Sequence, residues 1–395
     1  MNGRTNVANS TSLEILEIPL NPVTELHSQL KTDVIELMWT DPLDKYADDL
    51  GQITDEGDQL VSEWAYTIVV RKIGSQPSGP SDGEVITTST MRNQYQSTPY
   101  TDSTIVAGNT YYYGIYACNT AGIYSEGVFT EGYTPVQYDP ILGNNSWDVI
   151  DDACSKGLEQ SLWAVGDEID ITAMGEILTC IILDFNHDTL TDGSGTASIT
   201  FGLKNLMSFL NPQQFTGDTF YGATSGMRGW YDNTLYPGIE DSLRSKLKQV
   251  TKTSVNQRWR VTVNEYPGGT SISSSAYFGS KTTGNCYVFP FAAVEIKSNI
   301  ESSPGQYERG LDQGGTHYPY YTTIANQVKR MSNGTGAANT WHLRDYTETT
   351  GDRSGEDVMY VGSYETQLSS YFLKGDKTAN TYGICFGFCI GKAIS

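Results

Sequence analysis

The chain has 395 residues, and its 46 acidic side chains outnumber its 25 basic ones, which gives a net charge of −21. A surface this acidic repels phosphate backbones and anionic lipid headgroups, so we expect no nucleic-acid partner and no docking on anionic membranes. Only 18% of the residues are charged, whereas 40 are glycine and 26 are tyrosine. This composition favours a β-rich protein that presents a surface over a typical cytosolic enzyme.

The cysteines form no CxxC pair and match no zinc-binding spacing. The six positions are Cys118, Cys154, Cys180, Cys286, Cys385 and Cys389. Residues 1–18 contain no apolar segment typical of a secretory signal. The sequence also contains no run of about 18 apolar residues that would predict a membrane-spanning helix. We therefore expect synthesis in the cytosol, where thiols stay reduced, and interpret the six cysteines as small buried hydrophobic residues.

From about Leu13 to Val136, short alternating segments are separated by polar turns. Residues 32–40 and 63–74 alternate like strands, and a Pro- and Gly-containing connection follows the second of them. A later strand is predicted around residues 111–117, where alternate positions share one face: Tyr111, Tyr113, Ile115 and Ala117. Several short strands within about 120 residues predict an all-β antiparallel sandwich.

Two separated motifs make residues 1–137, with their N-terminal arm, resemble a fibronectin type III domain. The first motif is Trp39 followed by Asp41-Pro42, and the second is the stretch from Gly108 to Gly122. The resemblance implies a tyrosine corner at Tyr111, in which the phenol bonds to the backbone. One departure is the acidic insert at residues 46–62, which we expect to be a solvated loop. Such domains usually act as spacers or interaction modules.

Residues 138–146, with two prolines nearby and a Gly-Asn-Asn-Ser run, are predicted to be a linker. The pattern then changes from alternating strands to a mixture of strands and helices. Helical spacing of Ile239, Leu243, Leu247 and Val250 predicts a helix over residues 238–250, and a second helix is expected over residues 319–334. Strands are predicted at residues 165–171, 176–185, 198–203, 357–368 and 382–391. Residues 147–395 therefore have the pattern of an α+β domain with long loops.

The order of motifs in residues 147–395 resembles a domain of unknown function common in gut Gram-positive bacteria and their phages. The matching stretches read WAVGDEI, DFNHDTLTDGSGTASITF, GMRGWYDNTLYPGIEDSLRSKLKQVTK, TWHLRD and GICFGFCI. That family looks related to the C-type-lectin-like fold of formylglycine-generating enzymes and of diversified phage ligands. The resemblance implies a ligand face in irregular loops between Trp341 and the C-terminus. Asp345 stands where members often have serine.

The stretch from Ile181 to Phe201 raises the question of a metal site. Four side chains are spaced like oxygen ligands of a calcium loop, namely Asp184, Asn186, Asp188 and Asp192. However, the sixth position is Thr189 instead of Gly, and the twelfth is Gly195 instead of a bidentate Glu. Asp192-Gly193 is also a strong turn signal. We expect a polar hairpin or loop, with calcium as the alternative, and we expect His187 to hydrogen-bond a neighbouring loop.

None of the four histidines lies in a recognisable catalytic motif, and the sequence contains no GxSxG, HExxH or P-loop pattern. Cys385 and Cys389 share a face of a predicted strand, and packing is the favoured interpretation of both. A pair of carboxylates for glycoside cleavage is one alternative, but the sequence does not show which of its 46 acidic residues would lie close together. We expect no enzymatic activity and no cofactor other than the calcium alternative.

Aromatic side chains among polar loops are the candidates for ligand contact, because their faces stack on the apolar face of a sugar. Those singled out are Trp341, Tyr346, Tyr364 and Tyr371. For Trp341 and its neighbour Arg344, a place in the core is the favoured alternative.

Together these patterns predict a phage virion protein that is assembled in the host cytoplasm and exposed on the particle surface. It would be part of a tail fibre, baseplate or head fibre, with other virion proteins and a host-surface glycan as partners. We expect a homo-oligomer, with a trimer preferred. The alternatives are a bacterial carbohydrate-binding adhesion protein and, less favoured, a glycan-active enzyme.

Overall fold

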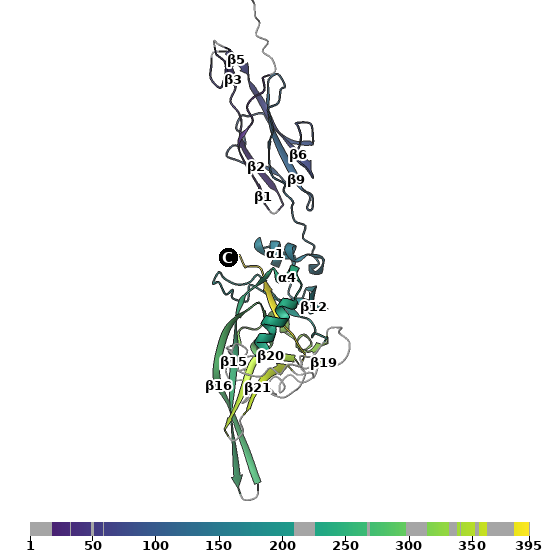
Figure 1. Ribbon diagram of the computed structural model, residues 1–395, viewed down its shortest axis with the longest axis vertical. Helices are drawn as coiled ribbons and strands as arrows, with labels where there is room; N and C mark the ends of the chain where they lie inside the picture. Colours follow the sequence, from purple (N-terminus) through teal and green to yellow (C-terminus); the bar gives the residue numbers. More distant parts are fainter. Residues whose placement is uncertain are drawn as a thin grey trace, which may run out of the picture. The chain divides into compact units, whose positions relative to one another are not determined.

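A computed structural model of the chain divides into two compact units, residues Met1–Gln137 and Tyr138–Ser395 (Figure 1). Each unit has a hydrophobic core of its own. The structure describes residues 18–31, 33–48, 51–57, 59–208, 226–266, 269–297, 314–331, 338–339, 341–351, 355–361 and 383–394. No helix among these residues is long and apolar enough to cross a membrane.

The described residues of the first unit form strands and no helix. One sheet has the order β1-β2-β8, with β1 at Thr24–Leu30, β2 at Ile35–Thr40 and β8 at Tyr100–Asp102. The other has the order β10-β9-β6-β7, with β6 at Trp64–Ile73, β7 at Glu84–Ser89, β9 at Tyr111–Asn119 and β10 at Val128–Phe129. All described pairings in both sheets are antiparallel. The predicted all-β sandwich agrees with this arrangement.

The core of the first unit lies between these two sheets, because each sheet contributes one alternating face. Ile35, Leu37 and Trp39 of β2 are buried at alternate positions. The face predicted around residues 111–117 is confirmed, since its four residues are at most 2% exposed. The Trp39 indole donates a hydrogen bond to the buried carboxylate of Asp41 at 2.9 Å.

The phenol of Tyr111 makes the backbone contact that its predicted position requires. Its oxygen accepts a hydrogen bond from the backbone N–H of Val106 at 2.7 Å. The guanidinium of Arg71 lies 5.4 Å from the centre of the Tyr111 ring, which provides a cation–π contact. The two contacts tie the start of β9 to the loop before it and to β6, respectively.

The acidic insert at residues 46–62 is more ordered than the solvated loop we expected. It contributes to a small sheet of order β4-β3-β5, with β3 at Lys45–Ala47, β4 at Ile53–Thr54 and β5 at Gln59–Ser62. Gly51 turns the chain with a φ of 79°, and the Asp48 carboxylate accepts the N–H of Gln52 at 2.8 Å. Asp therefore closes a turn here by bonding nearby backbone.

The second unit begins with residues 138–146, so the prediction of a separate linker is wrong. Leu142 is 1% exposed and belongs to the core of this unit. The Asn145 side chain donates to the backbone oxygens of Asp139 and Ile141, at 2.9 and 3.0 Å. These bonds fold the segment on itself, and the Trp163 indole, which donates to the backbone oxygen of Asp139 at 3.1 Å, joins it to the rest of the unit.

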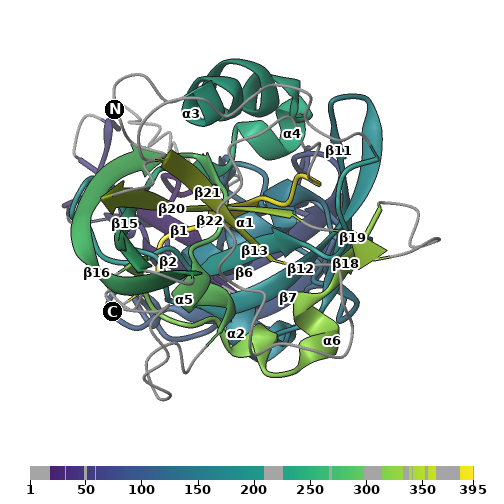
Figure 2. The same cartoon turned by 90° about the horizontal axis from the view of Figure 1, so that it is seen from below.

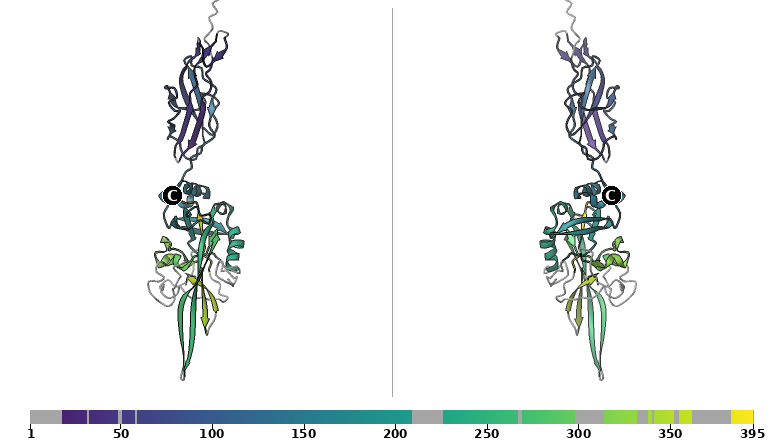
Figure 3. Two further views of the ribbon diagram at one scale, coloured as in Figure 1. Left: turned by 90° about the vertical axis from the view of Figure 1, so that its left-hand side faces the viewer. Right: turned by 90° about the vertical axis from the view of Figure 1, so that its right-hand side faces the viewer.

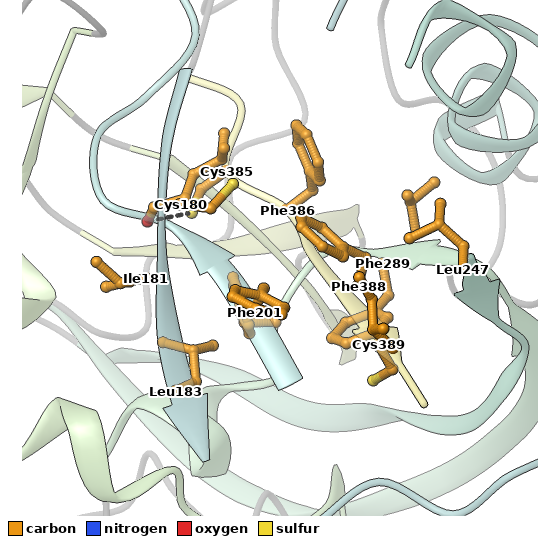
Figure 4. Packing of buried hydrophobic residues seen from close by; sticks show 14 of the residues in the cluster. Cys180, Ile181, Leu183, Phe201, Leu247, Phe289, Cys385, Phe386, Phe388 and Cys389 are labelled. Carbon is orange, nitrogen blue, oxygen red and sulfur yellow. Dashed lines mark hydrogen bonds between the residues drawn. The ribbon is translucent and has the colours of Figure 1, made fainter. Parts of the chain in front are cut away.

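The centre of the second unit is a sheet of order β11-β12-β13-β22-β14, with β17 also paired to β22. Its strands are β11 (Glu168–Ala173), β12 (Glu176–Phe185), β13 (Ile199–Leu203), β14 (Leu247–Lys248), β17 (Val288–Phe289) and β22 (Gly387–Ile390). The predicted strands at residues 165–171, 176–185, 198–203 and 382–391 are confirmed by β11, β12, β13 and β22. Figure 4 shows the aromatic packing on this sheet, where Phe201 and Phe388 stack with their ring centres 5.2 Å apart.

The helices are short and lie around the sheets (Figure 2). They are η1 (Leu142–Asn144), α1 (Trp147–Ser155), α2 (Glu159–Leu162), α3 (Gly226–Trp230), η2 (Tyr231–Leu235), η3 (Tyr236–Gly238), α4 (Asp241–Arg244), α5 (Ala293–Ile296), η5 (Pro319–Tyr321) and α6 (Ile324–Gln327). The N-cap of α1 is Ser146, whose hydroxyl accepts the N–H of Val149.

The prediction of one long helix over residues 238–250 is wrong. Only α4 is helical there, and Leu247 continues into β14, where it pairs with Ile390 of β22. Ile239, Leu243 and Leu247 are nevertheless buried. Their spacing reports burial correctly, but pairing with β22 overrides the local helical preference. The helix expected over residues 319–334 is likewise limited to η5 and α6 in the described part, which is followed by β18 (Lys329–Arg330), paired with β19 (Ala338–Asn339).

A second sheet of order β16-β15-β20-β21 contains a long hairpin (Figure 3). The hairpin strands are β15 (Val250–Tyr266) and β16 (Gly269–Cys286). They are joined by β20 (Trp341–Gly351), which pairs in parallel with β15, and by β21 (Gly355–Val361). The predicted strand at residues 357–368 thus agrees with β21 as far as Val361.

All six cysteines are buried and none is in a disulfide, as predicted. Burial raises the pKa of the Cys385 thiol to about 11, so this thiol stays protonated near neutral pH. The same is expected of Cys180, Cys389 and Cys154, whose pKa values burial also raises.

Candidate functional site

The most concentrated group of charged side chains in the second unit lies at the root of the long hairpin. We call it the buried ion cluster and define it as Asp188, Lys252, Glu295 and Arg344, with the phenol of Tyr318. These five residues are between 0% and 5% exposed. They come from the loop after β12, from β15, from α5, from β20 and from the segment before η5. The cluster therefore joins five segments that are far apart in the sequence.

Lys252 stands at the centre of the cluster. Its ammonium pairs with the carboxylate of Asp188 and, at 2.9 Å, with that of Glu295. It also donates to the Tyr318 phenol at 2.5 Å, and that phenol in turn donates to Asp188 at 2.9 Å. The Phe289 ring centre lies 4.0 Å from the ammonium and adds a cation–π contact. The one ammonium of Lys252 thus contacts two buried carboxylates.

Arg344 completes the cluster through a two-pronged ion pair with Glu295. Its Nη1 and Nη2 donate to the two carboxylate oxygens at 2.5 and 2.7 Å. The remaining donors bond the backbone oxygens of Thr253, Pro290 and Gly314 at 2.7 to 2.9 Å. This geometry uses the planar fork of arginine, which lysine does not reproduce.

The charges in the cluster support each other's ionised forms. Burial opposes ionisation of Asp188 and Glu295, but the neighbouring cations outweigh it and hold both carboxyl pKa values below their usual range. Burial also opposes the charge on Lys252, yet Asp188 and Glu295 raise its pKa. All three groups are consequently charged across the neutral range. An acid or base for proton transfer needs a pKa near the working pH, so the cluster is suited to holding the fold.

The pKa directions predict how stability depends on pH. The folded pKa values of Asp188 and Glu295 lie below their unfolded values of about 4, so their contribution is present above that pH and is lost as the pH falls. Lys252 has a raised pKa, and its contribution is lost only above about pH 10. We expect the melting temperature of the second unit to fall steeply from about pH 5 to about pH 3. A flat melting temperature over that interval would contradict this assignment.

The four residues spaced like a calcium loop are used in separate ways. Asp188 is in the ion cluster, and its carboxylate also accepts the hydroxyl of Thr200 at 2.7 Å. Asp192 accepts the N–H of Ser194 at 2.9 Å in a turn that Gly193 closes with a φ of 73°. Among the described residues, no group of three or more His, Cys, Asp or Glu side chains is placed to hold a metal ion. These contacts are those of the polar hairpin or loop that we expected from the sequence.

Asp184 and Asn186 lie at the end of β12 and do not join Asp188 in a cage of oxygen atoms. The Asp184 carboxylate accepts the N–H of Phe185 at 2.7 Å, and Asn186 takes a φ of 54°. Because Asp188 faces an ammonium and two hydroxyl groups, a calcium ion there would meet donors of the wrong kind. The pairing with Lys252 therefore favours the expected polar hairpin or loop over the calcium alternative at Asp188.

Chelation tests directly whether calcium binds at Asp188. We expect the melting temperature of the second unit to be the same with a chelator as with added calcium, because the ligand charge at Asp188 is already balanced by Lys252. Differential scanning calorimetry measures it. A chelator-induced fall that calcium reverses would restore the metal interpretation.

His187 bonds a neighbouring segment, as expected. Its Nε2 lies 2.7 Å from the hydroxyl of Thr316, and its ring packs on Tyr318 with centres 4.3 Å apart. Burial opposes its protonation, but the hydrogen bond with Asp188 outweighs that effect and raises the pKa of His187. This histidine joins the loop after β12 to the segment before η5.

Trp341 belongs to the core, so its prediction as a ligand contact needs correction. The residue is 0% exposed, and its indole N–H donates to the backbone oxygen of Gln327 at 3.3 Å. The ring meets Phe291 edge to face, with centres 6.1 Å apart. Both Trp341 and Arg344 thus follow the packing alternative considered for them.

Of the three candidate tyrosines, only Tyr346 has a described backbone. It lies on β20, next to Asn256 of β15 and Val358 of β21. Tyr364 and Tyr371 lie outside the described residues. Among the candidate aromatic residues, the structure therefore describes a core position for Trp341 and a strand position for Tyr346.

Asp345 has a clear structural role. Its carboxylate accepts the backbone N–H of Val255 at 2.9 Å and that of Ala293 at 2.7 Å. Burial raises the pKa of this carboxyl to about 6. The residue ties β20 to β15 and to the start of α5.

A second buried lysine lies apart from the ion cluster. The Lys329 ammonium donates to the backbone oxygen of Leu203 at 2.5 Å, and the rings of Tyr321 and Trp341 lie 5.5 and 5.6 Å from it. Burial lowers the pKa of Lys329. At 1% exposure, the amine is closed to a substrate and serves to join β18 to β13.

The first unit has an open cleft on its β1-β2 sheet. The cleft has a volume of about 280 Å³ and is lined by His27, Ser28, Gln29, Glu36, Met38 and Pro99. None of these residues was predicted as a site residue. Polar and apolar side chains both line the cleft, and the Glu36 carboxylate already pairs with the Lys31 ammonium at 2.8 Å.

Sequence reasoning missed Lys252, Glu295 and Tyr318. A signal was present for Glu295, which is the one charged residue in the otherwise apolar run at residues 288–296. An isolated charge in such a run indicates a buried partner. The identity of that partner requires tertiary structure, because Lys252 and Arg344 are each more than 40 residues away.

Comparisons with known proteins give little further information. No protein-family model matches the chain, and no curated protein does. Among solved structures, one match is to pectate lyase PelI from Erwinia chrysanthemi in complex with tetragalacturonic acid. The sequences are 22% identical over 27% of this chain and 27% of that one, with a TM-score of 0.17. The match spans about a quarter of either chain, and at that score it supports no statement about fold or activity.

Proposed function

We propose that the chain is a non-enzymatic surface protein of a phage particle, where it is part of a tail fibre, baseplate or head fibre. Its second unit would attach the particle to host-surface glycans, and its first unit would serve as a fibronectin type III-like spacer. Other virion proteins would be its neighbours in the particle. The proposal combines the sequence resemblances with the use that the fold makes of its charged residues.

The buried ion cluster is the observation that carries the proposal. Lys252 and Arg344 neutralise Asp188 and Glu295 inside the protein, and together they fix β15 and β20 at the root of the second sheet. Side chains that could perform acid–base chemistry are thus engaged in supporting a sheet. A rigid support of this kind is what a binding surface needs.

The first unit supports the spacer role. The buried Trp39–Asp41 hydrogen bond and the Tyr111–Val106 contact involve the residues that carry the fibronectin type III resemblance. A phenol bonded to backbone a few residues upstream is typical of the tyrosine corner in such sandwiches. For the second unit, the C-type-lectin-like assignment rests on its motifs.

Attachment to sugars favours repeated copies. A single sugar contact is weak, and symmetric display of several copies multiplies weak contacts into usable avidity. We propose a homo-oligomer, with three copies as the expected number. Calcium is not part of the proposed site, because Asp188 is paired with Lys252.

Localisation tests the proposal and its main alternative. We expect peptides of this chain in purified phage particles, and we expect antibodies raised against residues 138–395 to label intact particles in electron micrographs. Recovery of the chain from the bacterial cell surface, with none in particles, would instead support the alternative of a bacterial carbohydrate-binding adhesion protein.

A further inference from the structure

The buried ion cluster holds a lysine amine in direct contact with a carboxylate, away from solvent. The Lys252 ammonium donates to Asp188 Oδ1, and the two side chains are 3% and 6% exposed. Asp188 lies in the loop after β12, whereas Lys252 lies on β15, 64 residues later. An amine and a carboxyl group held in contact are the reactants of an amide bond, and such placement replaces the encounter that limits the reaction in solution.

Each of the three N–H groups of the Lys252 ammonium has an acceptor within the cluster. Besides Asp188 Oδ1, the acceptors are Glu295 Oε1 at 2.9 Å and the Tyr318 phenol oxygen at 2.5 Å. The phenol in turn donates to Asp188 Oδ2 at 2.9 Å. Tyr318 therefore bridges the lysine nitrogen and the second oxygen of the same carboxylate. This arrangement provides a path for a proton from the nitrogen to that oxygen.

The two oxygens of Asp188 have different surroundings. Oδ2 also accepts the Thr200 hydroxyl at 2.7 Å and the Cys389 thiol at 3.4 Å. Donors aimed at one oxygen stabilise the charge that develops there when its bond to carbon breaks. Oδ1 has the Nδ1 of His187 3.4 Å away, a partner suited to an amide oxygen. Oδ2 is thus the oxygen placed to leave.

The surroundings of the pair favour a neutral product over two buried charges. The ring centres of Phe289 and Tyr318 lie 4.0 and 5.1 Å from the Lys252 nitrogen. Glu295 and Tyr318 are at most 1% exposed. Burying ionised groups is costly even when they are paired, whereas an amide carries no charge. The same burial keeps bulk water from hydrolysing an amide once it has formed.

We propose that Lys252 and Asp188 condense after folding into an isopeptide bond, which cross-links β15 to the loop after β12. The Nζ–Cγ bond forms and the Cγ–Oδ2 bond breaks. The nitrogen gives up two protons, one through the Tyr318 phenol and one through Glu295 Oε1. Both protons end on Oδ2, which leaves as water. The ion pairs described above are the state that precedes the bond.

The reaction needs no cofactor, oxidant or outside acid or base. Because every proton stays within the cluster, the requirement that a catalyst's pKa match the working pH does not apply. The chain modifies itself once, which is compatible with a protein that turns over no substrate. The bond closes a loop between positions 64 residues apart and so restricts the unfolded chain. The proposal goes beyond the proposed function, and its test measures covalent structure and not glycan binding.

Mass spectrometry of the denatured full-length chain tests the bond. We expect the unaltered chain to be lighter than its sequence by the mass of one water molecule, and Lys252→Met to have its full calculated mass. Lys246→Met is the matched control, because the carboxylate that Lys246 contacts, Asp148, is 84% exposed. It should keep the loss of one water. An unaltered chain of full calculated mass would overturn the proposal.

Peptide mapping locates the bond without relying on how well a variant folds. After digestion of the denatured unaltered chain, we expect one branched peptide that joins the segments carrying Asp188 and Lys252. Asp192-Gly193 can also lose water, by cyclising onto its own backbone, but that product stays in a single linear peptide. A water loss found only in a linear peptide would overturn the proposal.

Tyr318→Phe tests the proton path, since it keeps the ring and removes the phenol that bridges nitrogen and oxygen. We expect Y318F to be purified with a smaller linked fraction than the unaltered chain, measured as the share of intact chains that lack one water. Equal linked fractions in the two chains would contradict the passage of a proton through Tyr318.

Discussion

Replacing Lys252 by methionine is expected to destabilise the second unit by about 3–5 kcal/mol, which is enough to unfold many domains of this size. The change leaves Asp188 and Glu295 as two buried carboxylates with Arg344 as the one remaining cation of the cluster. Denaturant unfolding followed by tryptophan fluorescence measures the effect.

The chain offers a matched control and an internal one. Lys246 also pairs with a carboxylate, that of Asp148 at 2.7 Å, but that carboxylate is 84% exposed. Exposed pairs contribute little, so K246M should change the free energy of unfolding by less than about 1 kcal/mol. The first unit has its own core and should unfold as before in both variants.

A compensating change separates charge balance from packing. The double variant D188N/K252M removes one charge of each sign and leaves Glu295 paired with Arg344. We expect it to recover part of the stability lost in K252M, since an uncompensated buried charge is the main cost. If K252M is as stable as K246M, the ion cluster does not hold the fold.

Loss of self-association is expected to weaken binding to host cells by about 10²–10⁴-fold, because the second and third contacts of an oligomer form at a high effective concentration. Residues 138–395 diluted to single chains should show this loss relative to the same residues displayed in several copies on an unrelated carrier. Flow cytometry with both labelled forms measures binding over a concentration series. If single chains of residues 138–395 bind host cells as tightly as the displayed copies, multivalent display is unnecessary.

The sequence predicted the first unit better than the second because half-buried antiparallel strands have a period of two that local reading detects. Residues 35–39 and 111–117 show that alternation clearly, and both form strands; the shared face predicted at residues 111–117 is buried. The burial of Ile239, Leu243 and Leu247 could also be predicted from their spacing in the sequence. The helix assigned to them was wrong because the same spacing suits a helical turn followed by a strand.

The candidate site was harder to predict. Asp188 was singled out as part of a polar hairpin or loop, with calcium as the alternative, since a loop of Asp and Asn residues has the same local pattern whether a metal or a lysine balances it. The actual partner, Lys252, lies 64 residues away. Trp341 was selected as an aromatic residue among polar neighbours, yet the strand that carries it turns the ring into the core.

The most direct test of the proposed function compares the two units on the same multivalent carrier. Residues 138–395 and residues 1–137 each form a compact unit with its own core, so each can be displayed separately after its folding is verified by melting. We predict that the displayed second unit binds host cells, that removal of surface glycans abolishes this binding, and that the first unit does not bind. Binding by the first unit alone, or none by the displayed second unit, would contradict the account.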